Sequence, residues 1–178
     1  MEMIRRLAVQ LQKVDHRWVY YVNQQWKCRW MDWLMLRITH LGGAGITLTF
    51  LGLWMLFVPS PARYWAVEGL MSLIFSHAAV RLGKHYWHRL RPYLQLSELR
   101  TFPDSLQDYS FPSGHTTAAF SIVVVWILHE PWLSCILLPP ALLVGLSRIY
   151  LGLHYPTDVA VGAWLGTVFS IGCHYLFF

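Results

Sequence analysis

Five apolar runs determine the class of fold that this chain can adopt. Hydrophobic residues make up 56% of its 178 residues and charged residues only 13%, against about 25% charged in a typical soluble domain. So few polar side chains cannot cover a surface that faces water, and we therefore expect membrane-spanning helices. The runs cover residues 43–58, 64–82, 116–128, 133–146 and 159–178.

Several of these runs are shorter than the roughly 20 residues that a membrane span needs, so flanking helical residues must extend them. Ten Trp, nine Tyr and nine Phe fit aromatic belts at two membrane interfaces. The length predicts one domain. We expect residues 1–178 to form a single all-α, polytopic membrane bundle with about five transmembrane helices, and we disfavour a soluble helical protein.

Residues 1–42 precede the first run and have a different pattern. No long apolar core follows the first charges, so we do not expect a cleaved signal peptide. The spacing instead predicts an amphipathic helix that lies in the membrane interface, with packing against protein as the alternative. Its apolar positions are Ile4, Leu7, Ala8, Leu11 and Val14, and its polar positions are Arg5, Arg6, Gln12 and Lys13.

Charge and cysteine content exclude other classes. The net charge is +5, but no soluble basic domain is present to bind nucleic acid, so anionic lipid headgroups are the expected partner. Cys28, Cys135 and Cys173 are scattered without metal-ligand spacing and indicate apolar filling rather than redox chemistry. The sequence carries no readable signal of oligomeric state.

Lys84 and Arg91 are the first of three chemical signals, all within residues 84–158. They are seven residues apart and share a face if the second apolar helix continues that far. Pro92 then ends the helix. Two cations on one face repel each other unless an anion lies between them, although snorkelling at an interface is the alternative for Lys84. Ordinary snorkelling is also our interpretation of the other basic residues nearby, which are Arg81, Arg89 and Arg100.

Pro112-Ser113-Gly114-His115 is the second signal. Proline, serine and glycine suit a helix start, and the free N–H groups there attract anions. His115 would project from this first turn toward a bound anion. Taken alone, the tetrapeptide predicts only a capped helix start.

Arg148, His154 and Asp158 are the third signal. Pro156 predicts a helix start, with Asp158 in the first turn, from where it reaches back to hold one ring nitrogen of His154 and leaves the other free to attack. A histidine capped by a carboxylate is the alternative. Two spans separate the second signal from the third, so all three should meet on one face of the membrane.

Together these residues resemble the signature of the type 2 phosphatidic acid phosphatase superfamily, which also includes bacterial acid phosphatases and vanadium haloperoxidases. The resemblance covers about residues 80–160, and the phrase at residues 38–42 is similar to small bacterial membrane members. The matching residues are Lys84, Arg91-Pro92, Pro112-Ser113-Gly114-His115, Ser147-Arg148, His154 and Asp158.

The resemblance implies a metal-independent lipid phosphatase without a cofactor. His154 would become phosphorylated, Asp158 would orient it and His115 would protonate the leaving group. The implied phosphate ligands are Lys84, Arg91 and Arg148 and the backbone of Ser113 and Gly114.

The resemblance ranks undecaprenyl diphosphate first as substrate, then phosphatidylglycerol phosphate and phosphatidic acid. A non-catalytic headgroup binder is the rival class. The resemblance also places the site on the extracytoplasmic side of the cell membrane. The positive-inside rule favours the cytoplasmic side instead, because seven Lys and Arg residues lie within residues 1–42.

Overall fold

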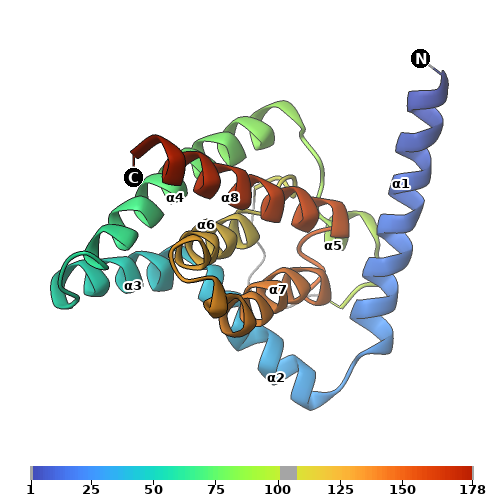
Figure 1. Cartoon of the computed structure of the whole chain (residues 1–178). Coiled ribbons are helices and arrows are strands. Elements are labelled where there is room, and N and C mark those ends of the chain that lie inside the picture. Colours follow the sequence, from blue (N-terminus) through green and yellow to red (C-terminus); the bar gives the residue numbers. More distant parts are fainter. Residues whose placement is uncertain (1, 101–107, 178) are drawn as a thin grey trace.

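The computed structural model describes residues 2–100 and 108–177 (Figure 1). Every element of regular secondary structure within these residues is a helix. This confirms the all-α prediction. The elements are α1 (Glu2–Tyr20), the π-helix η1 (Tyr21–Gln25), α2 (Arg29–Ile38), the 3₁₀-helix η2 (Thr39–Gly42), α3 (Ala44–Phe57), α4 (Arg63–Tyr86), α5 (Pro92–Gln95), α6 (Gly114–His129), the 3₁₀-helix η3 (Pro131–Leu133), α7 (Ser134–Tyr150) and α8 (Pro156–Phe177).

Each predicted apolar run coincides with one helix, in the order α3, α4, α6, α7 and α8. By length and composition, two helical stretches of the described chain can cross a membrane alone, Pro131–Tyr150 and Pro156–Leu176. A third is possible if Arg29–Gly42 and Ala44–Phe57, bent by 54° to each other, act as one span. The membrane character of the bundle is thus supported, whereas the number of five spans stays a prediction.

Helix α1 forms where the N-terminal pattern predicts it and lies along one side of the bundle (Figure 1). Its apolar residues Leu7, Leu11 and Val14 are about half exposed, and Leu11 and Val14 border a groove that is also lined by residues of α7 and α8. Near its end, Asp15 and Val19 are buried. The first part of α1 therefore presents an apolar stripe outward, and the last part is anchored to the bundle.

Helix α6 occupies the centre and packs against α4, α7 and α8. A Cβ atom added to Gly162 of α8 would lie 2.6 Å from the carbonyl oxygen of Ser113, and one added to Gly166 would lie 2.6 Å from that of Thr117. The missing side chains of this glycine pair therefore let α8 pack closely against α6. The close approach holds the starts of α6 and α8 side by side, and both starts carry predicted site residues.

Candidate active site

Four helix termini meet at one end of the bundle: the end of α4, the start of α6, the end of α7 and the start of α8. The three sequence signals lie at or beside these termini, and the structure brings the predicted residues together there. They are Lys84, Arg91, Ser113, Gly114, His115, Arg148, His154 and Asp158.

Lys84 and Arg91 meet, but not in the way that their spacing predicts. Helix α4 ends at Tyr86, and Arg91 has an extended backbone directly before the short helix α5, whose first residue is Pro92. The two cations therefore do not share a helical face. The chain turns away after α4, so that Arg91 approaches from the loop.

The anion expected between the two cations is a side chain of the protein. The Asp108 carboxylate accepts a hydrogen bond from Lys84 Nζ with one oxygen and from Arg91 Nη2 with the other. Burial alone would raise the pKa of Asp108, but the hydrogen bonds and charges of Lys84 and Arg91 outweigh it and lower this pKa to about 2. Sequence reasoning missed Asp108, because no motif marks it.

The surroundings of His154 favour a neutral imidazole ring. It is 1% exposed, and burial, followed by the charges of Arg148, Arg91 and Lys84, holds its pKa well below the usual value. Its Nε2 lies 3.1 Å from Nη1 of Arg91. The carbonyl oxygen of Arg148 accepts the His154 backbone N–H at 3.2 Å, which fixes the loop that carries the ring.

The expected hydrogen bond between His154 and Asp158 is not formed. Nδ1 of His154 lies 3.7 Å from Oδ2 of Asp158, which is an ion-pair distance beyond normal hydrogen-bond length. Both carboxylate oxygens already accept other hydrogen bonds: Oδ2 from the backbone N–H of Tyr155 at 2.8 Å, and Oδ1 from Arg89 Nη1 at 2.7 Å. Asp158 thus anchors the start of α8 and faces the imidazole.

The prediction that Arg89 snorkels at the membrane interface is wrong. Its guanidinium bridges Asp158 and Asp15, both almost fully buried, and donates to the Thr157 hydroxyl at 2.7 Å. It also lies over the ring of Tyr155, 3.9 Å from the centroid. Asp15 belongs to α1, so its distance along the chain hid this partnership from sequence reasoning.

The snorkelling prediction is also wrong for Arg100, which pairs with Asp32 of α2 at 3.3 Å. Asp32 also accepts a hydrogen bond from the Tyr150 hydroxyl at 2.6 Å. This pair ties the loop after α5 to α2 and to the end of α7. For Arg81 the side chain is exposed, as snorkelling predicts.

Helix α6 begins at Gly114, and Ser113 occupies the N-cap position, as predicted. The Ser113 side chain does not cap the helix, because its hydroxyl is paired with that of Thr116 at 3.0 Å. The Ser113 N–H donates instead to the carbonyl oxygen of Asp158 at 3.1 Å. This bond joins the second and third sequence signals through the backbone.

The segment at residues 38–42 forms one wall of the site. Nη1 of Arg148 donates to the Thr39 hydroxyl at 2.7 Å. Gly42 packs against His115, since a Cβ atom at this glycine would meet the His115 carbonyl group and lie 2.8 Å from Cγ1 of Val144. The short turn η2 thereby positions both Arg148 and the backbone of His115.

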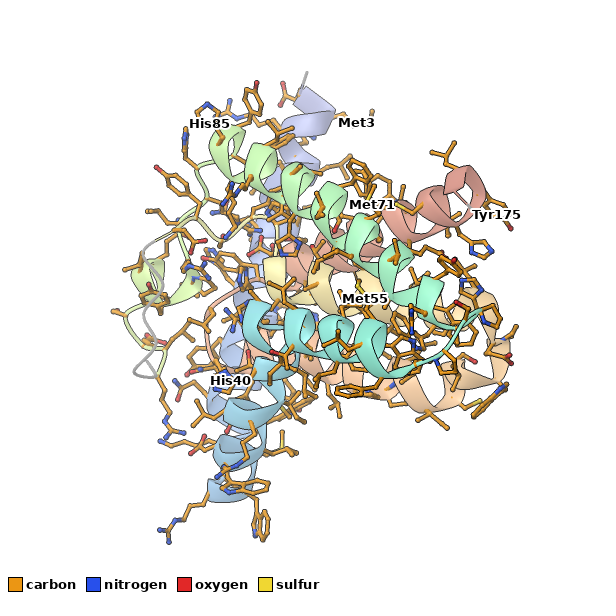
Figure 2. The ribbon with its side chains drawn as sticks, turned by 90° about the vertical axis from the view of Figure 1, so that its left-hand side faces the viewer. Met3, His40, Met55, Met71, His85 and Tyr175 are labelled. Carbon is orange, nitrogen blue, oxygen red and sulfur yellow. The ribbon has the colours of Figure 1, made fainter. Side chains whose placement is uncertain are left out.

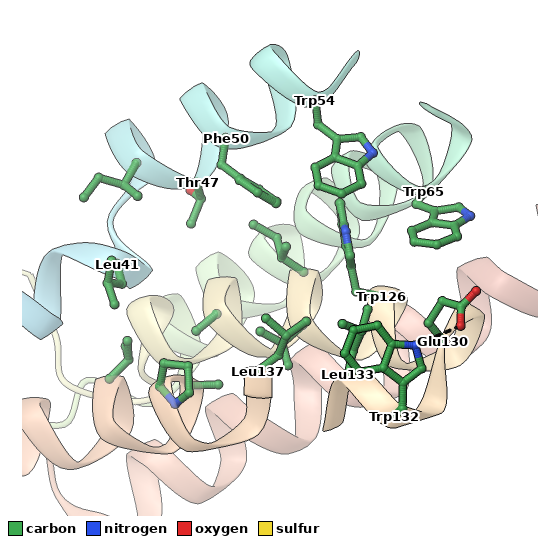
Figure 3. Close-up of a pocket in the computed structure, with 17 residues that line it drawn as sticks. Leu41, Thr47, Phe50, Trp54, Trp65, Trp126, Glu130, Trp132, Leu133 and Leu137 are labelled. Atoms are coloured by element: carbon green, nitrogen blue, oxygen red, sulfur yellow. Dashed lines mark hydrogen bonds between the residues drawn. The ribbon is translucent and has the colours of Figure 1, made fainter. Parts of the chain in front are cut away.

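An apolar cavity of about 720 Å³ begins beside this wall and runs between α3, α6 and α7 (Figure 3). Leu41 and Val144 line it near Gly42 and His115. Its other end lies among aromatic side chains such as Trp65 and Trp132. The volume falls in the range of known ligand pockets, about 300–1,000 Å³.

Among the residues that the structure describes, no three His, Cys, Asp or Glu side chains of this site converge closely enough to share a metal ion. In the described ranges, the group of His and Glu side chains spaced closely enough to share a metal ion is Glu68, His129 and His174. These residues lie at the opposite end of α4, α6 and α8 from the site.

A buried neutral histidine among three cations, beside an apolar cavity in a helical membrane bundle, defines a site for phosphate esters that carry an apolar group. Comparison with known proteins gives the family. Residues 65–178 match the PAP2 superfamily, and this chain belongs to it.

Two curated relatives and one solved structure illustrate the similarity. Undecaprenyl-diphosphatase of Sulfolobus acidocaldarius is 26% identical over 79% of this chain and 68% of its own length. Phosphatidylglycerophosphatase B of Bacillus subtilis is 34% identical over 77% and 70%. The crystal structure of Aquifex aeolicus LpxE superposes with a TM-score of 0.82 at 26% identity, over 91% of this chain and 95% of that one.

This chain spans little more than half the length of two further curated relatives, 54% of one and 59% of the other. The family and the names of these relatives support a membrane-associated phosphoric ester hydrolase.

Proposed function

We propose that this protein hydrolyses a lipid phosphate or diphosphate through a phosphohistidine intermediate, without a metal ion. The observation that carries the proposal is the His154 imidazole, whose pKa is lowered by burial and by three surrounding cations. A neutral imidazole has a free nitrogen lone pair, and cations around it attract the phosphate that it attacks.

The first step is an in-line attack of Nε2 of His154 on phosphorus. Nε2 is the nitrogen beside Arg91, whereas Nδ1 faces Asp158. As the N–P bond forms and the bond to the leaving oxygen breaks, positive charge develops on the ring, and the Asp158 carboxylate stabilises it. Lys84, Arg91 and Arg148 and the N–H groups at the start of α6 stabilise the phosphoryl oxygens.

His115 is the proposed general acid in this step, because it lies in the first turn of α6 beside Arg148, Lys84 and Arg91, which are proposed to hold the phosphate. The negative charge of the bound phosphate offsets these cations and favours the protonated ring that the step requires. It protonates the leaving oxygen. It then removes a proton from the water that attacks the phosphohistidine, which releases inorganic phosphate and returns His154 to its neutral form.

The apolar cavity beside His115 supports a lipid as the group attached to phosphate. We propose undecaprenyl diphosphate as the substrate, with undecaprenyl phosphate and inorganic phosphate as products, and a relative named undecaprenyl-diphosphatase supports this choice. Phosphatidylglycerol phosphate is the second candidate, because another relative is named phosphatidylglycerophosphatase B. Phosphatidic acid comes third.

The test is phosphate release by the detergent-purified protein from these three lipids in the presence of EDTA. The wild type is compared with His154→Ala and with His85→Ala, which removes an exposed histidine near the end of α4. We expect the wild type and His85→Ala to release phosphate at equal rates and His154→Ala to release none. Acid-labile phosphate on the wild-type protein, trapped by rapid quenching, would identify the intermediate.

Equal release by His154→Ala would refute the nucleophile assignment. No release from any lipid by folded wild-type protein would favour the rival reading, a non-catalytic protein that binds lipid headgroups. Dependence on vanadate for oxidation of halides would point to haloperoxidase chemistry instead.

We further propose that the site faces the extracytoplasmic side of the cell membrane, where a carrier lipid diphosphate would be hydrolysed during cell-wall synthesis. The basic residues of the N-terminal segment oppose this orientation under the positive-inside rule. A reporter fused after Phe178 tests it. Five spans with an outward site place this fusion in the cytoplasm, and a signal from outside the cell would overturn the proposal.

A further inference from the structure

The ends of α4, α6 and α8 that lie away from the active site hold a second polar cluster, formed by Glu68, His129 and His174. His115 and His129 are fourteen residues apart on α6, which corresponds to roughly 21 Å along a helix. In Figure 2, His85 of α4 and Tyr175 of α8 mark these two ends of the bundle and lie on opposite sides. The cluster is therefore separate from the phosphate site.

Glu68 is the centre of the cluster and is fully buried. Its Oε2 lies 2.7 Å from Nε2 of His129, and its Oε1 lies 3.0 Å from Nδ1 of His174. A buried ionised carboxylate is stabilised by a positive partner, and a metal ion is one such partner. Two imidazoles in their neutral form direct ligand nitrogens, rather than charge, at such an ion.

The three ligand atoms lie within 4.8 Å of one another. In a tetrahedral zinc site, with bonds of about 2.0–2.1 Å, neighbouring ligand atoms are roughly 3.3 Å apart. Side-chain movements on the order of 1 Å would reach that geometry. His129 is the last residue of α6, and His174 lies in the last turn of α8, so both are at helix ends where such movements are easily accommodated.

The surroundings orient the rings and leave a path for the ion. The Trp65 ring stacks on His129 with centroids 4.8 Å apart and an interplanar angle of 10°. The side chains of His129 and His174 are 19% and 22% exposed. A cation can therefore reach the buried carboxylate past the imidazoles, and water can occupy a fourth position.

We propose that Glu68, His129 and His174 bind one Zn²⁺ ion, which joins α4, α6 and α8 at the end of the bundle opposite the active site. Two histidines and one glutamate form a donor set that zinc prefers. The ion would stabilise the helix ends and take no part in phosphate chemistry. Removing it is expected to lower the Tm and to leave phosphate release intact at temperatures where the protein stays folded.

The experiment titrates chelator-treated, detergent-purified full-length protein, with its purification tag removed, first with Co²⁺ and then with Zn²⁺. We expect one Co²⁺ per chain with the visible absorption of a tetrahedral site, and its loss when Zn²⁺ displaces the probe. His129→Gln and His174→Gln should each weaken Zn²⁺ binding by about 100-fold or more, because even the loss of an outer hydrogen-bond partner costs about 10–100-fold.

His85→Gln is the matched control, since it removes an exposed histidine of α4 outside the cluster. It should keep one tight site. Zn²⁺ binding equal in the wild type and in His174→Gln, or loss of binding in His85→Gln, would overturn the proposal. If the cluster variants fail to fold, the wild type decides: one tetrahedral Co²⁺ and a Zn²⁺-dependent rise in Tm support the site, and the absence of both refutes it.

Discussion

Nη1 of Arg89 lies 2.7 Å from Oδ1 of Asp158, and Nη2 of the same guanidinium lies 2.6 Å from Oδ2 of Asp15. One cation thus joins the amphipathic N-terminal helix to the carboxylate behind the proposed nucleophile. Because both carboxylates are almost fully buried, Arg89 balances charge that water cannot screen. The N-terminal segment is therefore part of the support of the active site.

Arg89→Gln is expected to destabilise the protein by about 3–5 kcal/mol, because it leaves two buried carboxylates without their cation. It should also slow phosphate release, since Asp158 loses the contact that fixes its carboxylate. Adding Asp15→Asn in the same chain should restore part of the stability by removing one uncompensated charge. Thermal unfolding in detergent measures these effects, and an unchanged Tm in Arg89→Gln would contradict them.

Arg6→Gln is the control for charge removal from an ion pair. Arg6 pairs with Glu2 on the same helix, but their side chains are 76% and 80% exposed. Water screens such a pair, so the substitution should not measurably change the Tm or the rate of phosphate release.

Asp108 holds Lys84 and Arg91 in the position where we place the phosphate of the substrate. A substrate must therefore displace this carboxylate, which is 52% exposed. Asp108→Asn should lower the inhibition constant of inorganic phosphate by about two- to five-fold, which is the effect of removing a partly exposed ion pair of about 0.5–1 kcal/mol.

Product inhibition assays on the wild type and Asp108→Asn measure this change, with Glu98→Gln as a control carboxylate outside the cation pair. A weaker affinity for phosphate in Asp108→Asn would mean that Asp108 positions the two cations rather than competing for them.

The sequence predicts where the helices lie and that the three signals meet, but it misses most of the side-chain partners within the site. Apolar runs and helix-start residues such as Pro156 are local signals, so the helices and the meeting of His154 with the cations are predictable. The end of α4 at Tyr86, by contrast, is unmarked by any breaker until Pro92. The partnership of Arg89 with Asp15 spans 74 residues, a separation over which spacing carries no information.

Because His154 must be neutral to attack phosphorus, kcat/KM for phosphate release should depend on pH. Because burial and nearby cations lower its pKa, the acidic limb of kcat/KM should lie below pH 6.5, the usual value for histidine. Arg148→Gln removes a positive charge that disfavours the protonated ring, so the pKa of His154 rises and this limb moves to higher pH. The rate itself should fall by about 10²–10³, the effect of losing one donor to the transition state.

Normalised pH profiles of the wild type, Arg148→Gln and the exposed-residue control Arg81→Gln test this sign. The Arg81→Gln limb should coincide with that of the wild type. A limb that stays in place in Arg148→Gln, or that moves to lower pH, would show that His154 is not the group that titrates.

Gly42 and Gly45 are a matched pair for testing the wall of the site. A Cβ atom at Gly42 would lie 2.8 Å from Cγ1 of Val144 and closer still to the carbonyl oxygen of His115, whereas one at Gly45 meets nothing within 4 Å. Gly42→Ala should therefore cost about 1–3 kcal/mol of stability through overpacking. It should also slow phosphate release, because the backbone of His115 must shift.

Gly45→Ala lies in the first turn of α3 and should leave both the Tm and the rate unchanged or raise the Tm slightly, since alanine favours a helix over glycine. Thermal unfolding and phosphate release by the two variants, measured side by side, separate a specific contact from a general effect of added side chains. Equal behaviour of the two variants would mean that η2 can move away from α6 without consequence. The proposed role of this turn in holding the general acid would then fail.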